Sequence, residues 1–475
     1  MSAVPTAPAR VIAYERRRAG VPASTGQTWQ QRLLRDRWTW AAVALAVSYA
    51  AVGYFFVHAL GKDTPAEEGG VIPGLNGDAL WASAKAAAPT LLVLTALFLI
   101  ADRYRPQRLL VWSLALGWGA VMAITGSYFL NSWAGAQLAV YDMAPGLDSA
   151  RIAIFIAPFV EEACKATILF LIAFIDRGRV VSRLSGAVLA GLTAVGFAFT
   201  ENIVYFARVI VYGSHTYGAD VSAAFQELVF MRGVVTCFGH PLFTVMTGIG
   251  LAVGLRARSK AVRVGAPLAG YLGAALLHMG FNAVASLVSD GTALQLIYFA
   301  VALPLVFVVA LKIIVYAISQ SRLIRDRLTD YVVMGWLPAP YPVLFSRGRT
   351  RAWALCMSLW HGSLPATVRL QRAAVELAYL RDAVTAGVVD QGGLWREHEL
   401  IGQIRALRSQ GAIENPRGLR PYFWRLLRDK IGYRGPVPHI LKDKAHRGRG
   451  QWSEPALSGA PVSHSAVNPR WGPPA

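Results

Sequence analysis

Charged side chains are scarce in this chain. Only 16% of its 475 residues are Asp, Glu, Lys or Arg, while 55% are hydrophobic. A soluble globular protein carries about 25% charged residues, so the composition argues against an ordinary soluble enzyme and favours an integral membrane protein. The charge that is present is mostly of one sign, with 47 basic against 27 acidic residues.

Cysteine is almost absent. The three cysteines, Cys164, Cys237 and Cys356, lie far apart, so they predict neither a disulfide framework nor a paired-cysteine metal motif. Internal repeats of a convincing period are lacking as well. The first apolar run is too long for the core of a cleaved signal peptide, and we expect it to be an uncleaved membrane span.

Long apolar runs are the main feature of the sequence. A membrane-spanning helix needs about 20 mostly apolar residues, and eight stretches meet that requirement. They are predicted at residues 38–60, 82–101, 109–130, 150–175, 184–211, 229–255, 265–289 and 294–318. The predicted fold class is therefore all-α, a polytopic bundle of about eight transmembrane helices with a mostly helical and disordered cytoplasmic tail.

Loop charge predicts the orientation of the chain. Basic loops alternate without a break with acidic or neutral ones, from the arginine-rich segment 1–37 to Arg322, Arg325 and Arg327 after the last span. Basic loops stay in the cytoplasm. Both termini are therefore predicted to be cytoplasmic, in an integral multi-pass protein of the plasma (cytoplasmic) membrane.

The chain is expected to divide into four parts. These are a basic segment at 1–37, an eight-span membrane domain at 38–318, a cytoplasmic helical region at 319–413 and a basic Pro- and Gly-rich tail at 414–475, expected to be disordered. The catalytic core is placed at about 150–290. Periodicity predicts helices over Ala366–Ala386 and Leu394–Leu407.

The region after the last span is strongly basic. Residues 319–475 hold 23 basic and 11 acidic residues, so they supply +12 of the net charge of +20. A basic segment next to a membrane attracts anionic lipid, which is the partner we expect for it. No recognised DNA-binding motif is visible, so nucleic acid is not an expected partner.

Ionisable residues cluster inside four of the apolar runs, the fourth to the seventh, although each costs about 2.5–3.5 kcal/mol there. They stand in the motifs Glu161-Glu162-Ala163-Cys164-Lys165, Phe199-Thr200-Glu201-Asn202, Gly239-His240-Pro241 and His278-Met279-Gly280-Phe281-Asn282. Residues of this kind inside a membrane mark a functional site by default.

The four motifs are predicted to lie at one depth. Glu161, Glu201, His240 and His278 each stand about 10 or 11 residues from the outer end of their run, which is about 16 Å at 1.5 Å per residue. That distance is half of a hydrocarbon core about 30 Å thick. Two inward and two outward helices thus bring carboxylates and imidazoles to the bilayer centre.

Spacing within the runs refines this site. His278 and Asn282 are four residues apart and share a helix face, as do Glu161 and Lys165, so Lys165 can neutralise one carboxylate. Glu161 and Glu162 point about 100° apart around a helix. One of them is expected in the site and the other beside it.

Prolines and glycines indicate how the helices around the site are shaped. Pro158 and Pro241 stand beside the motifs and predict kinks that open a water-accessible cavity. Five glycines are expected to let helices pack closely: Gly248, Gly250, Gly254, Gly270 and Gly273.

These residues suit two chemistries. His240, His278 and Glu162 match the His2Glu set of zinc hydrolases, in which a fourth position stays open. Alternatively, a glutamate activates water as a general base without a metal, while histidine and Asn282 stabilise the oxyanion. Glu201 supports either arrangement. Both chemistries lead to hydrolysis within the membrane.

The motifs EExxK, FTEN, GH and HxxxN, in this order on successive spans, resemble those of the PrsW family of intramembrane proteases, which is related to the type II CAAX prenyl proteases and bacteriocin-processing enzymes. The resemblance covers about residues 150–290 and the number of spans. It implies endopeptidase cleavage of a membrane protein, such as a single-span anti-sigma factor. The site residues that it implies are Glu161, Glu162, Glu201, His240, His278 and Asn282.

Two other functions fit the same pattern. An ion- or proton-coupled transporter would use the carboxylates and histidines as a proton relay. A non-catalytic scaffold would bind transmembrane helices in the same cavity. Transporters often carry polar residues in two repeated halves, whereas here these residues fall only in runs four to seven. The sequence therefore favours the protease.

Overall fold

The computed structural model describes residues 37–65, 71–104, 107, 109–141, 148–175, 180, 182–216, 220–257, 259–385 and 391–413. The predictions for the basic N-terminal segment before residue 37 and for the tail from residue 414 lie outside these described residues. The chain forms two compact units, residues 28–317 and residues 318–475 together with 1–27.

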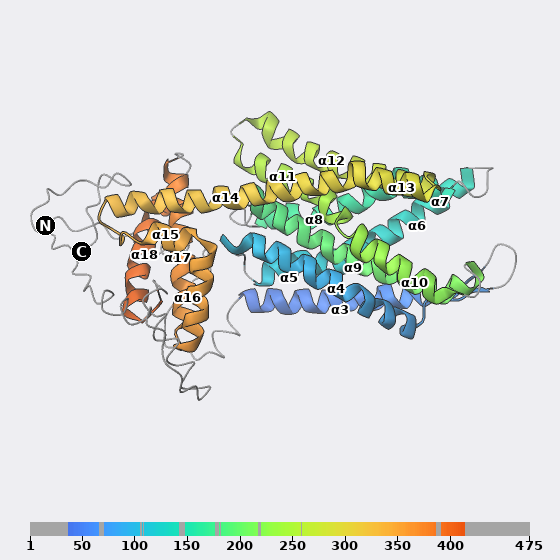
Figure 1. Cartoon of the computed structure of the whole chain (residues 1–475), viewed down its shortest axis with the longest axis horizontal. Helices are drawn as coiled ribbons and strands as arrows, with labels where there is room; N and C mark the ends of the chain where they lie inside the picture. Colours follow the sequence, from blue (N-terminus) through green and yellow to red (C-terminus); the bar gives the residue numbers. More distant parts are fainter. Residues whose placement is uncertain are drawn as a thin grey trace, which may run out of the picture. The chain divides into compact units, whose positions relative to one another are not determined.

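Residues 28–317 form a helical bundle (Figure 1). Its α-helices are α3 (Arg37–Leu60), α4 (Gly77–Ala101), α5 (Leu109–Gly117), α6 (Ile124–Tyr141), α7 (Asp148–Arg151), α8 (Ala157–Ile175), α9 (Arg183–Thr216), α10 (Val221–Phe230), α11 (Gly239–Arg256), α12 (Lys260–Leu287), α13 (Gly291–Ile297) and the first part of α14 (Leu303–Val333). Within the described residues, four π-helical segments interrupt them, namely η2 (Trp118–Ala123), η3 (Ile152–Ile156), η5 (Met231–Val235) and η6 (Tyr298–Ala302).

Three shorter elements also belong to the described part of this unit. The 3-10 turn η1 (Asp102–Tyr104) follows α4 directly. The strands β1 (Thr64–Pro65) and β2 (Val71–Ile72) pair antiparallel in the connection between α3 and α4. The all-helical class predicted from the apolar runs is confirmed, because this ladder is only two residues long.

Seven helices within the described residues are long and apolar enough to cross a membrane. They are Thr39–Leu60, Gly77–Tyr104, Leu109–Gln137, Arg183–Gly213, Val221–Arg256, Lys260–Leu287 and Gly291–Val333. Each corresponds to one of the eight predicted runs. The remaining run is the fourth, where α8 carries three charged residues, Glu161, Glu162 and Lys165, so the count of eight spans stays a prediction.

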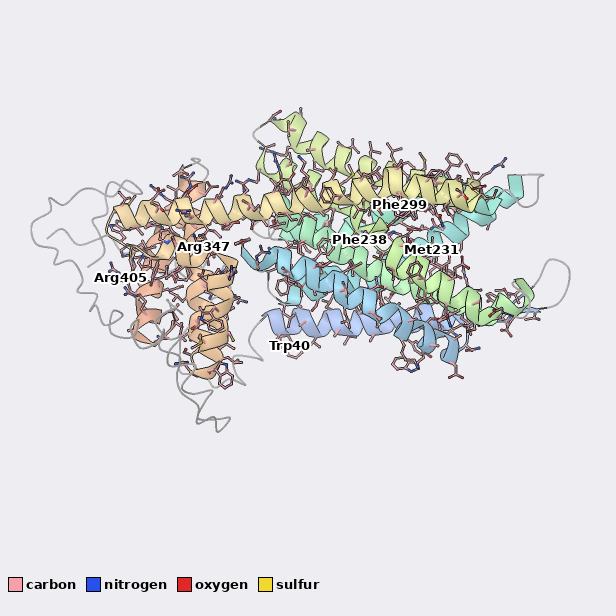
Figure 2. The ribbon with its side chains drawn as sticks, viewed as in Figure 1. Trp40, Met231, Phe238, Phe299, Arg347 and Arg405 are labelled. Carbon is pink, nitrogen blue, oxygen red and sulfur yellow. The ribbon has the colours of Figure 1, made fainter. Side chains whose placement is uncertain are left out.

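The bundle is built around α9. This helix packs against α4, α5, α8 and α11, and its Leu189, Leu192, Val195 and Phe197 are at most 1% exposed. Apolar side chains on the outer helices are instead exposed, as Trp40 and Phe299 illustrate (Figure 2). An apolar outer surface of this kind suits a lipid environment, in which exposing apolar groups costs nothing.

Glycines set the closest helix crossings. A Cβ at Gly248 would meet the carbonyl of Gly186 across α11 and α9, and a Cβ at Gly250 would meet the carbonyl of Ala266 in α12. Gly270 in turn faces the carbonyl of Met246. The close packing that the sequence predicts at these glycines is confirmed, and it sets how near α11 lies to both neighbours.

The sixth run was predicted as one span over 229–255, but its helix is broken. The chain leaves the helix at Thr236–Phe238, between η5 and α11. Pro241 has no N–H, so it cannot donate to the carbonyl of Cys237 as a continuous helix requires. A new helix therefore begins at Gly239, with Pro241 in its first turn, where the missing N–H does not matter. The kink expected at Pro241 is a full interruption.

The last run was predicted to end at residue 318, but α14 continues to Val333. Its final part is amphipathic rather than apolar. Ile324, Leu328 and Tyr331 are fully buried, while Arg322 and Arg325 on other faces are exposed. Burial of one face in the second unit stabilises the helix beyond the apolar run.

The second unit contains this part of α14 and four further helices, α15 (Tyr341–Ser346), α16 (Gly348–Trp360), α17 (Leu364–Thr385) and α18 (Gln391–Ser409). The helices predicted over Ala366–Ala386 and Leu394–Leu407 are confirmed by α17 and α18. Both pack against each other, with Leu370, Leu400 and Ile404 fully buried.

Polar groups are also buried in the second unit. The Tyr331 hydroxyl donates a hydrogen bond to Glu397 Oε1, and Arg381 Nε lies 2.9 Å from Asp330 Oδ2. Arg396 Nε donates to Glu376 Oε1 over 3.0 Å. Burial raises the pKa of the Glu397 carboxyl from 4.5 to about 7.

Substitution Gly248→Ala tests the crossing of α9 and α11. The added methyl would lie against Gly186 and 2.7 Å from Ala190 Cβ, so we expect a loss of about 1–3 kcal/mol in the free energy of unfolding. Thermal unfolding in detergent measures it. Gly265→Ala in α12 is the control, since nothing lies within 4 Å of its new Cβ. Equal melting temperatures for the two variants would contradict the crossing.

The raised pKa of Glu397 predicts a pH dependence in the second unit. Its folded value, about 7, lies above the unfolded 4.5, so its stabilisation is complete below pH 4.5 and is lost as the pH rises to 7. The protection of α18 amides against hydrogen exchange, taken relative to the intrinsic exchange rate at each pH, should therefore fall over that interval in the full chain. Glu397→Gln should abolish this pH dependence. Asp326→Asn, at an exposed residue of α14, is the control and should leave the pH dependence unchanged. A persistent dependence in Glu397→Gln would assign it to another group.

Candidate functional site

Four helices bring their ionisable residues together in the bundle. Glu161, Glu162 and Lys165 come from α8, Glu201 from α9, His240 from α11 and His278 from α12. The interactions between them all lie within 4 Å. This is the convergence that the common depth of the four motifs predicts.

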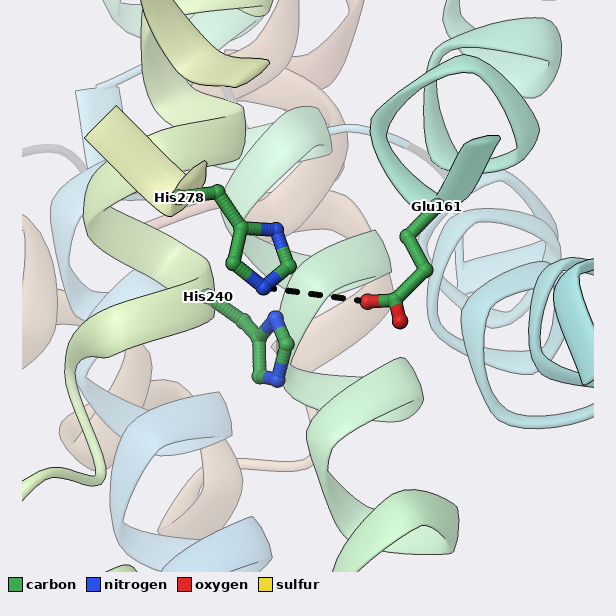
Figure 3. A group of neighbouring side chains, drawn as sticks. All are labelled: Glu161, His240 and His278. Carbon is green, nitrogen blue, oxygen red and sulfur yellow. Dashed lines mark ion pairs between the residues drawn. The ribbon is translucent and has the colours of Figure 1, made fainter. Parts of the chain in front are cut away.

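His278 stands between the two adjacent glutamates. Its Nδ1 is 3.4 Å from Glu162 Oε1, and its Nε2 is 3.9 Å from Glu161 Oε2 (Figure 3). The Phe243 ring stacks on the imidazole at a centroid distance of 4.9 Å. His278 is only 3% exposed, so packing restricts its ring to this orientation.

The two glutamates have different surroundings. Glu162 is fully buried, and its Oε2 accepts a hydrogen bond from Thr244 over 2.8 Å. Its Oε1 accepts another from Lys165 over 2.9 Å. Glu161 lines the cavity described below, and its buried Oε2 has no hydrogen-bond partner. The expectation that one carboxylate lies in the site and the other beside it matches this arrangement.

Lys165 is the central cation of the cluster. It is fully buried, and its Nζ lies 2.9 Å from Glu162 Oε1, 3.5 Å from Glu161 Oε2 and 3.0 Å from His240 Nδ1. The ammonium also lies 3.9 Å from the centroid of the Phe197 ring. Because an ammonium only donates hydrogen bonds, Nδ1 of His240 must be the acceptor.

This bond fixes the tautomer of His240. With Nδ1 accepting, the proton of the neutral ring is on Nε2, which donates to Glu201 Oε2 over 2.8 Å. Glu201 is in turn paired with Arg232, whose Nη2 donates to the same oxygen. The imidazole of His240 is therefore oriented by Glu201, whose negative charge is balanced by Arg232.

Asn282 lines the cavity, and its amide group bonds to the backbone. Its Nδ2 donates to the carbonyl of Ala153 in η3 over 2.8 Å, and no bond joins it to the glutamates or histidines of the cluster. A π-helical segment leaves its carbonyls less well satisfied than an α-helix does. Asn282 thus supports the backbone just before α8 while lining the cavity.

Other side chains support the broken helix in the same way. Thr90 of α4 donates to the carbonyl of Gly233 over 2.7 Å, and Tyr298 donates to that of Val235 over 2.8 Å. Irregular backbone is tolerated inside a membrane only where such partners or a cavity satisfy it. These side chains therefore stabilise the interruption before His240, and the interruption places His240 in the first turn of α11.

An open cavity of about 110 Å³ meets the cluster, which is room for several water molecules. Glu161, Glu201, His240, His278 and Asn282 line it, together with Arg232, while Glu162 does not. Much of the remaining wall is apolar, from α4, α9 and α12. Water can thus reach the ionisable groups inside an otherwise apolar bundle.

Three of these residues form a group that could hold a metal ion. One ligand atom from each of Glu161, His240 and His278 lies within 4.8 Å of the others. The sequence named the same two histidines but proposed Glu162 as the third ligand. Glu162 is instead committed to Lys165 and Thr244.

Sequence reasoning missed Arg232 and Thr244. Arg232 stands near the outer end of the sixth run, where a single arginine is unremarkable, and only its spacing of eight residues before His240 hinted at the cavity. Thr244 is a hydroxyl in an apolar run, four residues after His240, and shares its helix face. Neither residue could be assigned to the site from the sequence, because that assignment depends on which helices pack together.

Comparison with known families agrees with this site. Residues 105–310 match the family model described as PrsW family intramembrane metalloprotease, which covers every residue of the cluster. No curated protein and no solved structure matches the chain. The resemblance indicated by the four motifs is confirmed over residues 105–310, and the long apolar helices support an integral multi-pass membrane protein.

Proposed function

We propose that this chain is a zinc-dependent intramembrane endopeptidase that hydrolyses a peptide bond of a membrane protein. The observation that carries the proposal is the convergence of Glu161, His240 and His278 on one cavity. Two imidazoles and one carboxylate are a ligand set that zinc favours, and catalytic zinc sites keep a further position open for water or substrate.

The donor atoms fit such an ion. Glu161 Oε2 is buried and lacks a hydrogen-bond partner, a state that costs free energy unless something else satisfies it. The nitrogen of His278 that faces this oxygen is Nε2, at 3.9 Å. In His240 the nitrogen with the lone pair is Nδ1, which accepts from Lys165. His240 would hold a metal through this lone pair, while Lys165 would keep its bond to Glu162.

The other two glutamates orient the imidazoles. Glu162 faces His278 and is balanced by Lys165, and Glu201 faces His240 and is balanced by Arg232. Carboxylates behind ligand histidines are a recurrent arrangement in metal sites, because they fix the ring and its tautomer. Glu161 is the carboxylate left to act at the reaction centre.

The reaction follows from these roles. When bound, a zinc ion supplies Lewis-acid activation of water and of the peptide carbonyl. The chain itself holds the three ligands, excludes bulk water with an apolar wall and keeps both orienting carboxylates paired with cations. A glutamate-activated water without metal was the second chemistry open from the sequence. Glu161 Oε2, which accepts no hydrogen bond and lies near two imidazoles, favours the metal.

The substrate class follows from the location of the site. A cavity inside a bundle of apolar helices is reached by chains that enter the bilayer, so the substrate is a membrane protein, and the family resemblance points to a single-span anti-sigma-type regulator. Both termini are proposed to be cytoplasmic because of the alternating loop charge. The basic region after the last span is proposed to contact anionic lipid.

Substitution Glu161→Gln tests the activity. Membrane N-terminal proteomes of the native host, with and without membrane stress, compare wild type with this variant at equal expression. We expect new termini in or beside transmembrane segments only with wild type. Glu227→Gln, an exposed glutamate of α10, is the control and should match wild type. Identical profiles for wild type and Glu161→Gln would refute the protease.

Metal content tests the ligand set separately. We expect the purified chain to hold about one zinc ion, and Glu161→Gln or His278→Gln to lower its affinity at least tenfold, because each removes one of three protein ligands. Metal analysis after dialysis measures it, with Glu227→Gln again as the control. Zinc retained at equal affinity by both ligand variants would rule out this site.

A further inference from the structure

Arg232 is a cation in the cavity wall that none of the motifs predicts. It lies on η5, and its side chain is 25% exposed. Its Nε donates to Asn202 Oδ1 over 2.8 Å, and its Nη2 donates to Glu201. The guanidinium carbon lies 4.0 Å from the ring centroid of Tyr205. These three contacts hold one side of the guanidinium against α9.

The other side of the guanidinium has unused donors. Arginine carries five N–H groups, and the bonds to Asn202 and Glu201 use two of them. Within the part of the chain that the structure describes, Nη1 has no acceptor. Arg232 nevertheless lines the same cavity as Glu161 and His240. Its spare donors are therefore available to a ligand in that cavity.

The charge of Arg232 limits which ligand fits. Glu201 already balances it, so a second carboxylate gains little there and would add to the charge of Glu161 nearby. A neutral acceptor gains the full hydrogen bond without that repulsion. A peptide carbonyl oxygen is such an acceptor.

A membrane-embedded substrate offers carbonyls of this kind only when it is unwound. In an intact transmembrane helix every carbonyl is bonded within the helix, and no water is present to replace a lost bond. Hydrolysis requires access to one peptide bond, so the helix must open around it. The freed carbonyls then need donors from the protein.

We propose that Arg232 binds main-chain carbonyl oxygens of an unwound transmembrane segment and so forms a substrate-backbone subsite beside the hydrolytic centre. This inference rests on the proposed function. Glu201 Oε2 joins the two places, because it accepts from both His240 and Arg232. A carbonyl on Arg232 therefore lies next to the residues that act on the peptide bond.

The packing of this wall agrees with such a role. Neither α10 nor η5 contains a buried residue, whereas α11 buries eleven of its eighteen. The half-helix that carries Arg232 is thus the lightly packed side of the cavity. A bound substrate segment would therefore replace fewer packing contacts of the protein at η5 than at α11.

Photo-crosslinking in proteoliposomes tests the subsite. The full chain carrying Glu161→Gln, which prevents turnover, is reconstituted with a synthetic Leu/Ala transmembrane peptide bearing photo-leucine. One peptide is a continuous helix and the other has a central Gly-Pro interruption. We expect the interrupted peptide to be captured in the cavity in preference, and Arg232→Lys to lower its capture about tenfold, because lysine keeps the charge but loses the planar fork of donors.

Controls separate binding from positioning. Arg208→Lys, an exposed arginine of α9 outside the cavity, should leave capture unchanged. In the Glu161-containing chain, Arg232→Lys should keep its zinc, since Glu201 stays paired. If Arg232→Lys folds poorly, the double variant Arg232→Gln with Glu201→Gln removes both charges together and should lose capture as well.

Three results would overturn the inference. The first is equal capture of the two peptides, and the second is undiminished capture in Arg232→Lys. The third is a loss of zinc in Arg232→Lys while capture is retained. That third result would make Arg232 only a positioning residue for His240. Failure of the proposed function looks different, since it appears in the unsubstituted chain as missing zinc and missing cleavage products.

Discussion

The cost of placing charge in an apolar bundle governs this structure. A carboxylate or ammonium inside a membrane persists only with a partner and with its hydrogen bonds satisfied. The chain meets this condition with two ion pairs, Glu162 with Lys165 and Glu201 with Arg232. Each pair also faces an imidazole on another helix. The same interactions that make the charges tolerable thus tie α8, α9, α11 and α12 into one arrangement.

The irregular backbone around the site follows from the same constraint. His240 reaches the cluster from the first turn of α11, which exists because the helix breaks before Pro241. A broken helix leaves carbonyls that lipid cannot satisfy, and side chains of other helices supply the donors, as Thr90, Tyr298 and Asn282 do. Polar residues distant from the reaction are therefore required for the geometry of the residues that act. This explains why Asn282 stands in a motif although it bonds to backbone.

Much of this could be predicted from the sequence, because hydropathy and helical rise act locally. The apolar runs predicted seven of the helices, and counting residues from their ends brought Glu161, Glu201, His240 and His278 to one level. What could not be predicted depends on rotation about each helix axis and on neighbours. Adjacent Glu161 and Glu162 differ only in the direction in which they point, so their division between cavity and ion pair needed the packed helices. Arg232 was missed for the same reason, since its value lies in facing Glu201.

The balance of charge connects the stability of the bundle to its proposed metal. The carboxylates of Glu161, Glu162 and Glu201 outnumber the cations Lys165 and Arg232 by one when both imidazoles are neutral. The excess charge belongs to Glu161, whose Oε2 is 3.5 Å from Lys165 but accepts no hydrogen bond. A divalent cation held by Glu161, His240 and His278, as proposed, would satisfy this carboxylate. Its binding to the folded chain alone would then stabilise the fold by mass action. The proposed hydrolytic residues therefore belong to the same charged cluster that the bundle must accommodate, and we expect a change at Glu161 to alter both metal binding and stability.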